Sequence, residues 1–273
     1  MPGISLRVVL FFAVMGLTLS GAQGQMIVAH RGASHDAPEN TMAAFDLAWQ
    51  QGSSGIEGDF YLTADKQIVC IHDADTMKTA GRKLMVEKST LKQLRELEYG
   101  AWKGAQFQGE SIPTFDQVLA CVPAGKTFVI ELKSKLKIVP ALVEALKRSN
   151  TDEIKLLIIT FDEATATECK RQLPDVKVHW LTSFDKRQSP PTPTAEQIAS
   201  VVRRSGVDGV GMKGDTGILN GQFVQTLQQS GCKEFHVWTV DSIRDAKYFQ
   251  QLGAIGITTN VPAVIANAIR RAQ

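Results

Sequence analysis

The sequence has no closely spaced cysteine pair, and this absence argues against a structural zinc site. Its four cysteines, Cys70, Cys121, Cys169 and Cys232, are widely dispersed along the chain. Most of them lie in or beside apolar runs, where cysteine behaves as a small buried hydrophobic residue. We therefore expect free thiols rather than disulfides, although an exported protein could form disulfides.

A marked excess of charge of either sign is also absent. Lysine and arginine together number 30 and aspartate and glutamate 28, which gives a net charge of +2. Without a polybasic stretch, this balance predicts neither nucleic-acid binding nor strong attraction to a membrane surface. Hydrophobic residues make up 44% of the chain and charged residues 21%, a composition that excludes disorder and predicts a sizeable core.

Acidic residues are missing from the start of the chain, where the first is Asp36. Residues 1–24 instead combine a basic side chain at Arg7, an apolar run over residues 8–19 and a stretch of small residues. This pattern is typical of a cleavable secretory signal peptide, and the run is shorter than the roughly 18 residues that span a bilayer. The alternative is an uncleaved anchor. We expect a secreted or periplasmic mature domain over residues 25–273, with no membrane span after cleavage.

Eight short apolar runs alternate with helical patterns along the rest of the chain. The expected strands are residues 26–30, 55–62, 127–133, 155–161, 176–181, 207–212, 234–240 and 254–259. The expected helices include residues 41–51, 139–149, 163–173, 195–205, 219–231 and 243–252. Continuously apolar strands are typical of a parallel sheet covered on both faces, and eight β/α units of this total length predict a (β/α)₈ TIM-type barrel. The alternative, an open doubly wound sheet, would normally carry a glycine-rich turn after its first strand, where Gly32 stands alone.

A small inserted subdomain interrupts the alternation after the second strand. Residues 67–71 predict an extra strand, and residues 73–113 follow as a long insertion with an expected helix over residues 90–97. Insertions of this size usually shape the mouth of a barrel, so we expect this one to pack over one side of it. The proline-rich residues 188–194 predict an exposed loop.

Polar side chains gather where the expected strands end, which is the face that carries the active site of such barrels. They are His30, Arg31, Glu57, Asp59, His72, Glu131 and Lys133. Residues two apart on a strand point to the same face, so Glu57 and Asp59 can both face the barrel axis together with Glu131.

Three converging carboxylates are difficult to keep ionised without a cation. Oxygen ligands of this kind favour one divalent cation, Mg²⁺ or Ca²⁺, over zinc. The alternative is a structural network in which Arg31 and Lys133 neutralise the acids.

The other polar groups are suited to phosphoryl chemistry. His30 and His72 can move protons near neutral pH, while Arg31 and Lys133 can bind a phosphate. A cation, two proton-transfer groups and two anion-binding groups together indicate hydrolysis of a phosphoryl ester. The remaining histidines, His35, His179 and His236, receive no primary role.

Ordered sequence blocks along the mature chain resemble a known family. They are AHRGA from Ala29, APENT from Ala37 with Phe45, EGDFYLT from Glu57, VCIHD from Val69, GESIPTF from Gly109, VIELK from Val129, VWTV from Val237 and GITTN from Gly256. In this order the blocks closely resemble those of the glycerophosphodiester phosphodiesterase family. One departure is Asn260, which stands where the family often has aspartate.

The resemblance implies an enzyme that hydrolyses a small-molecule glycerophosphodiester to glycerol 3-phosphate and the free alcohol. It implies the following roles: His30 and His72 as the general acid–base pair; Glu57, Asp59 and Glu131 as ligands of the divalent metal; Arg31 and Lys133 at the phosphate; Glu39 and Asn40 at the edge of the site; and Trp238 lining the pocket.

Two alternative functions are compatible with this sequence. A lysophospholipase D acting on longer lipids could use the same barrel, and an apolar rim near Trp102 and Phe107 would favour it. A non-catalytic module that only binds phosphodiesters would be expected to lack a histidine or a metal carboxylate, and neither is missing. The segment Gly211-Met-Lys213 matches no family block.

Overall fold

The computed structural model describes residues 25–270. The expected signal peptide lies outside the described residues and stays a prediction. Within the described part, no helix combines the length and apolar character needed to cross a membrane.

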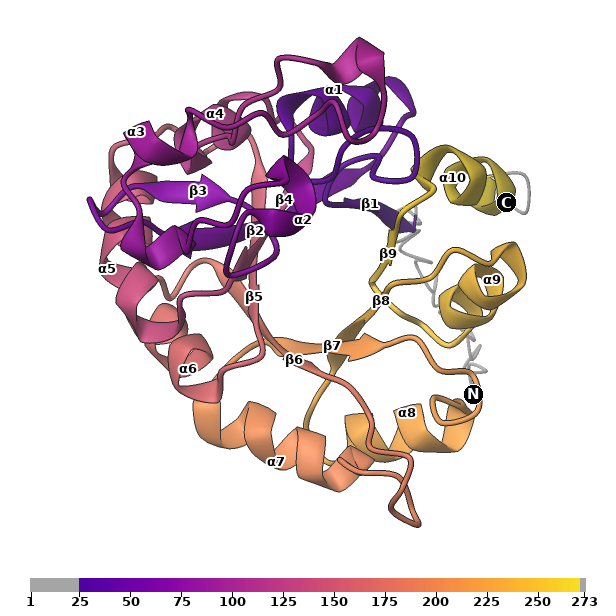
Figure 1. Cartoon of the computed structure of the whole chain (residues 1–273). Coiled ribbons are helices and arrows are strands. Elements are labelled where there is room, and N and C mark those ends of the chain that lie inside the picture. The colour runs from indigo at the N-terminus through magenta and orange to yellow at the C-terminus, as the bar shows by residue number, and fades with distance from the viewer. Residues whose placement is uncertain (1–24, 271–273) are drawn as a thin grey trace, which may run out of the picture.

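Eight parallel strands close into a ring (Figure 1). In ring order they are β1 (Met26–His30), β2 (Gly55–Leu62), β4 (Thr127–Leu132), β5 (Lys155–Thr160), β6 (Lys177–Thr182), β7 (Gly209–Lys213), β8 (Glu234–Trp238) and β9 (Gly256–Thr259). The ring is closed because β1 pairs with both β2 and β9. A ninth strand, β3 (Ile68–Cys70), pairs antiparallel with β2. The predicted (β/α)₈ barrel is therefore confirmed.

The helices that follow the strands cover the outside of the ring (Figure 1). They are α1 (Met42–Gln50), α4 (Phe115–Ala120), α5 (Val139–Lys147), α6 (Glu163–Gln172), α7 (Ala195–Ser205), α8 (Gly221–Gln229), α9 (Ile243–Gln251) and α10 (Pro262–Arg270), with the 3₁₀ turn η3 (Lys135–Ile138). Several begin at a short polar residue whose side chain accepts a hydrogen bond from a first-turn backbone N–H, as Thr41, Asp162 and Asn220 do. Such caps fix where each loop becomes a helix. Because the eight strands of the ring are parallel, their carboxyl ends all open on one face.

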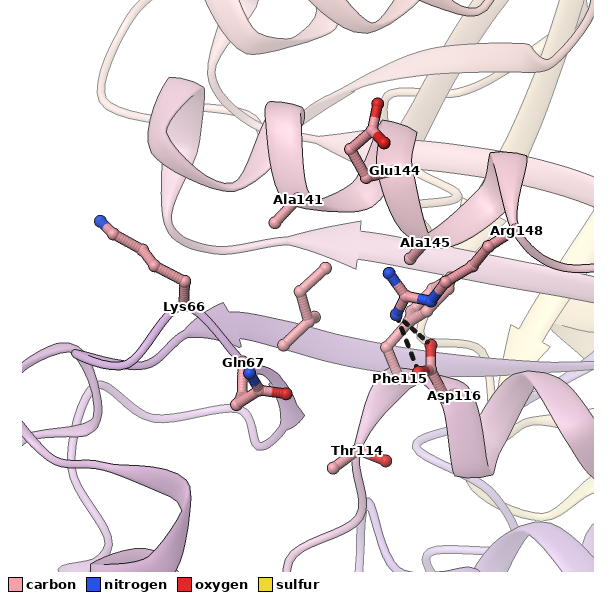
Figure 2. A pocket seen from close by; sticks show the side chains of 10 residues that line it. Lys66, Gln67, Thr114, Phe115, Asp116, Ala141, Glu144, Ala145 and Arg148 are labelled. Atoms are coloured by element: carbon pink, nitrogen blue, oxygen red, sulfur yellow. Dashed lines mark hydrogen bonds and ion pairs between the residues drawn. The ribbon is translucent and has the colours of Figure 1, made fainter.

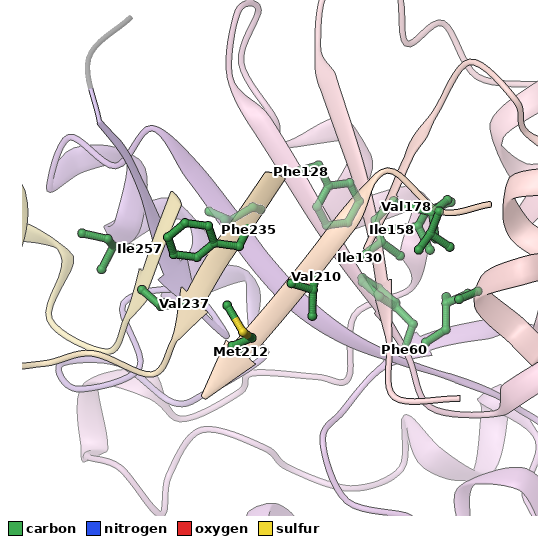
Figure 3. Packing of buried hydrophobic residues seen from close by; sticks show 14 of the residues in the cluster. Phe60, Phe128, Ile130, Ile158, Val178, Val210, Met212, Phe235, Val237 and Ile257 are labelled. Atoms are coloured by element: carbon green, nitrogen blue, oxygen red, sulfur yellow. The ribbon is translucent and has the colours of Figure 1, made fainter. Parts of the chain in front are cut away.

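Outward-facing strand residues form the main core between the ring and the helices. Figure 3 shows Phe128, Ile158, Val178, Val210 and Met212 packed in this layer. All five are completely buried. Because side chains alternate along a strand, the residues between them face the inside of the barrel.

The inside of the barrel holds a second, smaller apolar cluster. Val28, Val129, Leu157, Ile159 and Leu181 pack there, with Met26 and Trp238 against them. These side chains fill the inside of the barrel between its strands.

A pair of buried histidines shares the interior with this cluster. His179 on β6 and His236 on β8 stack with ring centroids 5.1 Å apart, and their Nδ1 atoms are 2.9 Å apart. The intervening strand β7 makes room because a Cβ at Gly211 would lie 2.4 Å from the His236 ring and one at Gly209 2.8 Å from His179 Nε2. One Nδ1 must donate to the other, so the pair tolerates only one proton between these two atoms. Burial lowers the pKa of both imidazoles.

The insertion is built from short elements around its own apolar cluster. They are α2 (Met77–Ala80), η1 (Val86–Lys88), α3 (Leu91–Leu94) and η2 (Ala105–Phe107). Val69 and Ile71 from the β3 segment pack against Leu94 and Tyr99 of the insertion. The insertion reaches the loop after β1, where Lys103 Nζ donates to the Ser34 carbonyl at 2.9 Å.

The helix expected over residues 90–97 is shorter than predicted. Thr90 caps it and forms a reciprocal pair of hydrogen bonds with Gln93. After Leu94 the chain tightens to i→i−3 bonds, from Glu96 N to the Gln93 carbonyl and from Leu97 N to the Leu94 carbonyl, which ends the α-helix. Helices α4 and α10 were not among the helices predicted from the sequence.

The four cysteines are free, as expected. Cys70, Cys169 and Cys232 are buried and Cys121 is partly buried. They act as small core side chains in the described structure.

From the buried histidine pair we predict that the folding stability of the protein falls at acidic pH. Because its folded-state pKa is lowered, His236 takes up a proton on unfolding at pH values below about 6.5, and folding stability should fall there. Replacing His236 with asparagine should flatten the decline between pH 7.5 and 5.5 by up to about 1.4 kcal/mol per pH unit. Urea unfolding over this range measures the effect, with the exposed His35→Asn as control. Parallel curves for wild type and H236N would contradict the assignment.

Candidate active site

The loops and strand ends at the mouth bring the predicted residues into one cluster. In the barrel register His30 lies beside Glu57, and Asp59 lies beside Glu131. The side chains of these last three acids all point inward, and each is at least nine-tenths buried.

Glu57, Asp59 and Glu131 can each offer one carboxylate oxygen to a common point. These oxygens lie within 4.8 Å of one another. Burial, followed by the charge of Asp59, raises the pKa of Glu57 well above its usual range and that of Glu131 to about 7. Three carboxylates held this closely oppose one another's ionisation.

A divalent cation fits this set. Glu57 Oε2 accepts from the Arg31 backbone N–H at 2.9 Å, but Glu57 Oε1 is buried without a hydrogen-bond partner among the described residues. A buried acceptor without a donor is costly, and a cation would satisfy it. All the donors are oxygens, the ligands that Mg²⁺ and Ca²⁺ prefer.

Arg31 and Lys133 flank the carboxylates with positive charge. Arg31 Nε lies 3.2 Å from Asp59 Oδ2, and Lys133 Nζ lies 3.0 Å from Asp59 Oδ1 and 2.5 Å from Glu131 Oε1. Burial would raise the pKa of Asp59, but the charges of Lys133 and Arg31 lower it overall. The two cations thus keep Asp59 ionised, and Glu57 has no side-chain cation of its own. The ion network that the sequence left as an alternative exists, but its three acids face only two bases.

A tight turn after β1 aims Arg31 at the site. Arg31 has a φ of +56° and Gly32 a φ of +78°. A Cβ at Gly32 would lie 2.6 Å from the Ala44 backbone, so only glycine allows the turn to pack this closely against α1.

Glu39 and Asn40 hold the two sides of this arrangement. Glu39 accepts from Arg31 Nη1 at 3.0 Å and from Lys78 Nζ of the insertion at 2.8 Å. Asn40 Nδ2 donates to Asp59 Oδ2 at 2.8 Å, and Asn40 Oδ1 accepts from the Asp59 backbone N–H at 3.2 Å. Both residues position charged groups of the site.

His30 is oriented by a hydrogen-bond chain from the opposite edge of β1. Its Nδ1 lies 2.7 Å from Asn260 Oδ1, while Asn260 Nδ2 donates to Asp241 Oδ2 at 2.7 Å. An amide oxygen only accepts, so His30 Nδ1 carries the proton and Nε2 is left as a free base. Burial, and then the charge of Arg31, lowers the pKa of His30 to about 4. His30 is therefore neutral near pH 7.

His72 has a different setting. Its Nδ1 lies 2.7 Å from Asp73 Oδ1, and about a third of its side chain is exposed. Its charge acts on both His30 and Asp59, which places it at the same site. Nδ1 of His72 thus faces a carboxylate, whereas Nδ1 of His30 faces an amide oxygen, so the two histidines have different surroundings.

Trp238 lies on the other side of the mouth, on β8, four strands from β4 in either direction around the ring. Its ring packs edge-on against Phe161, with centroids 5.4 Å apart. Its indole Nε1 is buried and has no partner among the described residues. The structure therefore separates Trp238 from the charged cluster and leaves it a free hydrogen-bond donor.

The sequence-based reading did not identify Asp241, Phe161 or Asp73 as site residues. Asp241 directly follows the block VWTV, and Asp73 is the last residue of the block VCIHD. Extending the first block by one position, and considering the last residue of the second as a partner of His72, would have found them. Phe161 lies in none of these blocks, so no sequence pattern assigned it to the site.

The hollow in Figure 2 is not part of this site. It has a volume of about 230 Å³ and is lined by residues such as Lys66, Thr114 and Glu144, beside an ion pair between Arg148 and Asp116. A second hollow of about 420 Å³ lies between the start of α1 and the insertion. Neither contains a predicted catalytic or metal residue, so we base the functional assignment on the chemistry of the mouth.

Comparison with known proteins agrees with this geometry. The sequence model described as the glycerophosphoryl diester phosphodiesterase family matches residues 30–264. A glycerophosphodiester phosphodiesterase of Caldanaerobacter subterraneus subsp. tengcongensis is 30% identical over 252 residues, covering 90% of this chain and 98% of the relative. An Oleispira antarctica phosphodiesterase, solved in complex with its product sn-glycerol-3-phosphate, superposes with a TM-score of 0.79 at 26% identity, covering 90% and 96% of the two chains. A Thermotoga maritima glycerophosphodiester phosphodiesterase shares the fold, with a TM-score of 0.71 at 21% identity over 89% and 97%.

The contact between His30 and Asn260 predicts the effect of restoring a carboxylate. In Asn260→Asp, an acceptor with a full negative charge would face His30 Nδ1, and it should raise the pKa of His30 from about 4 toward 6.5. NMR titration of the His30 ring measures this. Asn220→Asp, which changes charge equally at the cap of α8, serves as control. An unchanged pKa in N260D would show that Asn260 does not govern His30.

Proposed function

Because the chain belongs to the glycerophosphoryl diester phosphodiesterase family, we propose that it hydrolyses glycerophosphodiesters to glycerol 3-phosphate and the free alcohol with the help of one divalent cation. The observation that carries this proposal is the cluster of three buried carboxylates beside two histidines with different surroundings. The product bound to the Oleispira antarctica relative is the one expected here.

Glu57, Asp59 and Glu131 would hold the cation, which is Mg²⁺ or Ca²⁺ by the chemistry of its ligands. When bound, the cation polarises phosphoryl oxygens and offsets the charge that develops on them. With the cation bound, the three acids would face two bases and two further positive charges, so the site would carry a net charge of about +1, which favours an anionic phosphodiester.

Arg31 and Lys133 bind the remaining phosphoryl oxygens. Arg31 offers a planar fork of donors and Lys133 a compact charge. Glu39 and Asp59 hold the guanidinium from two directions, so the arginine enters the reaction already oriented, which lowers the entropic cost of binding.

His30 and His72 divide the proton transfers. His30 Nε2, unprotonated near neutral pH, takes the proton from the attacking hydroxyl, either of water or of the substrate's own glycerol. In the second case the attack forms a cyclic phosphate, which water then opens to glycerol 3-phosphate. His72, whose Nδ1 lies 2.7 Å from Asp73 Oδ1, donates a proton to the departing alkoxide. Each transfer of this kind contributes roughly 10²–10⁴ to a rate.

A second candidate is a lysophospholipase D-like activity on the same barrel. Exposed apolar side chains stand in segments at the mouth, namely Met77, Trp102, Leu136, Phe161 and Ile243. Apolar surface of this kind could contact an acyl chain. A panel of diesters that includes lysophosphatidylcholine beside glycerophosphocholine separates the two functions, because only the lysophospholipase D would prefer the acylated substrate.

Metal dependence is the first test of the proposed function. EDTA should abolish release of glycerol 3-phosphate from glycerophosphodiesters, and Mg²⁺ or Ca²⁺ should restore it. Glu57→Gln should need a higher concentration of the cation because it loses a charged ligand, whereas Glu196→Gln on the outer helix α7 should behave as wild type. Full activity in exhaustively chelated protein would overturn the metal assignment.

Leaving-group chemistry tests the histidines. His30→Ala and His72→Ala should each lower turnover by roughly 10²–10⁴. A diester whose alcohol is p-nitrophenol needs little acid assistance, so it should partly rescue H72A but not H30A. His35→Ala provides the control. Equal rescue of both variants, or of neither, would show that the division of roles is mistaken.

A further inference from the structure

Lys213 is a basic side chain at the mouth that the proposed mechanism does not use. It is the last residue of β7 and is exposed. Its neighbour Met212 is completely buried in the outer core with Val210 (Figure 3). The inner face of β7 is occupied by Gly209 and Gly211, whose missing side chains would meet the histidine pair. Since side chains alternate along a strand, Lys213 shares this inner face and projects into the mouth.

The position of β7 sets Lys213 opposite the carboxylates. β7 lies four strands from β2 in either direction around the ring. Lys213 is in register with Trp238 on β8, the residue with the unpartnered indole N–H. The next residue fixes the exit of the strand, because Gly214 N donates to the Trp238 carbonyl at 2.7 Å and a Cβ there would lie 2.7 Å from Val240.

The charge of Lys213 is not neutralised by the protein. Asp215 lies near enough for the charge of Lys213 to contribute to lowering its pKa, but its ion pair is with Lys186. Within residues 25–270, Lys213 makes no ion pair and no side-chain hydrogen bond. Because Asp215 pairs with Lys186, the ammonium group of Lys213 is available to bind an anionic group of a ligand in the mouth.

We propose that Lys213 binds a second anionic group, carried on the alcohol half of the substrate. This inference rests on the proposed function and specifies its substrate class: glycerophosphodiesters whose alcohol bears a further phosphate, phosphodiester or carboxylate. The scissile phosphate is held near Arg31 and Lys133. The insertion, tied to Ser34 and to Glu39, occupies the β1 side of the mouth, so a long substituent extends toward β7 and β8. There the donors that it meets are Lys213 and the indole of Trp238.

The test compares two diesters that differ in the charge of the leaving alcohol. Glycerophosphoglycerol releases neutral glycerol, whereas bis(glycerophospho)glycerol releases an alcohol with a second phosphodiester. In Lys213→Gln the ratio of kcat/KM for the second substrate to that for the first should fall about three- to tenfold. In wild type, 0.5 M NaCl should reduce the same ratio, because an exposed charge pair is screened.

Lys233→Gln is the matched control. It removes the same charge just before β8, at the opposite end of the barrel, and should leave the ratio as in wild type. A second variant tests the role of Asp215: Lys186→Gln frees this carboxylate to pair with Lys213 and should lower the ratio in the same direction. An unchanged ratio in K213Q, or an equal fall in K233Q, would overturn the inference.

Failure of the proposed function gives a different result. If wild type hydrolyses neither diester, the proposed function is wrong. Calorimetric titration of the wild type with both intact diesters then decides the present inference, since K213Q should still weaken binding of the doubly anionic one selectively. If each diester binds wild type and K213Q with the same dissociation constant, the inference about Lys213 is contradicted.

Discussion

The mutual repulsion of three buried carboxylates is the constraint on which the mouth of this barrel depends. Glu57, Asp59 and Glu131 are held together by the register of β2 and β4, away from water. Their environment is organised to relieve this repulsion, first through Arg31 and Lys133 and then, in the proposed function, through a cation. Because two bases cannot balance three ionised acids, burial and mutual repulsion raise the pKa of Glu57 and Glu131 in the protein alone, and a cation would allow all three acids to ionise.

The histidines show how differently one residue type can be used within one fold. His30 is kept neutral by burial and by a neighbouring guanidinium, and an amide fixes its tautomer. His72 is more exposed, and its Nδ1 contacts the carboxylate of Asp73. His179 and His236 have no access to the mouth and fill the interior above the two glycines of β7. Environment, not residue type, distinguishes the proposed base, the proposed acid and the buried pair.

Much of this architecture could be predicted from the sequence because it follows from local patterns. Continuous apolar runs predicted the strands, and the positions of Glu57, Asp59 and Glu131 at strand ends predicted their convergence. The sequence could not predict contacts that depend on distant strands. The pairing of His179 with His236 depends on the empty inner face of β7, and the support of His30 by Asp241 depends on closure of the ring between β9 and β1. The shortened helix after Thr90 likewise reflects packing of the insertion around its own core.

The insertion has a separate apolar core and contacts the rest of the barrel through polar pairs such as Lys78–Glu39, Lys103–Ser34 and Glu87–Lys137. Replacement of its surface would therefore leave the closure of the ring and the carboxylates untouched. Substitutions on the surface of the insertion, away from Asp73 and Lys78, would therefore change what reaches the mouth without moving the groups that surround the carboxylates.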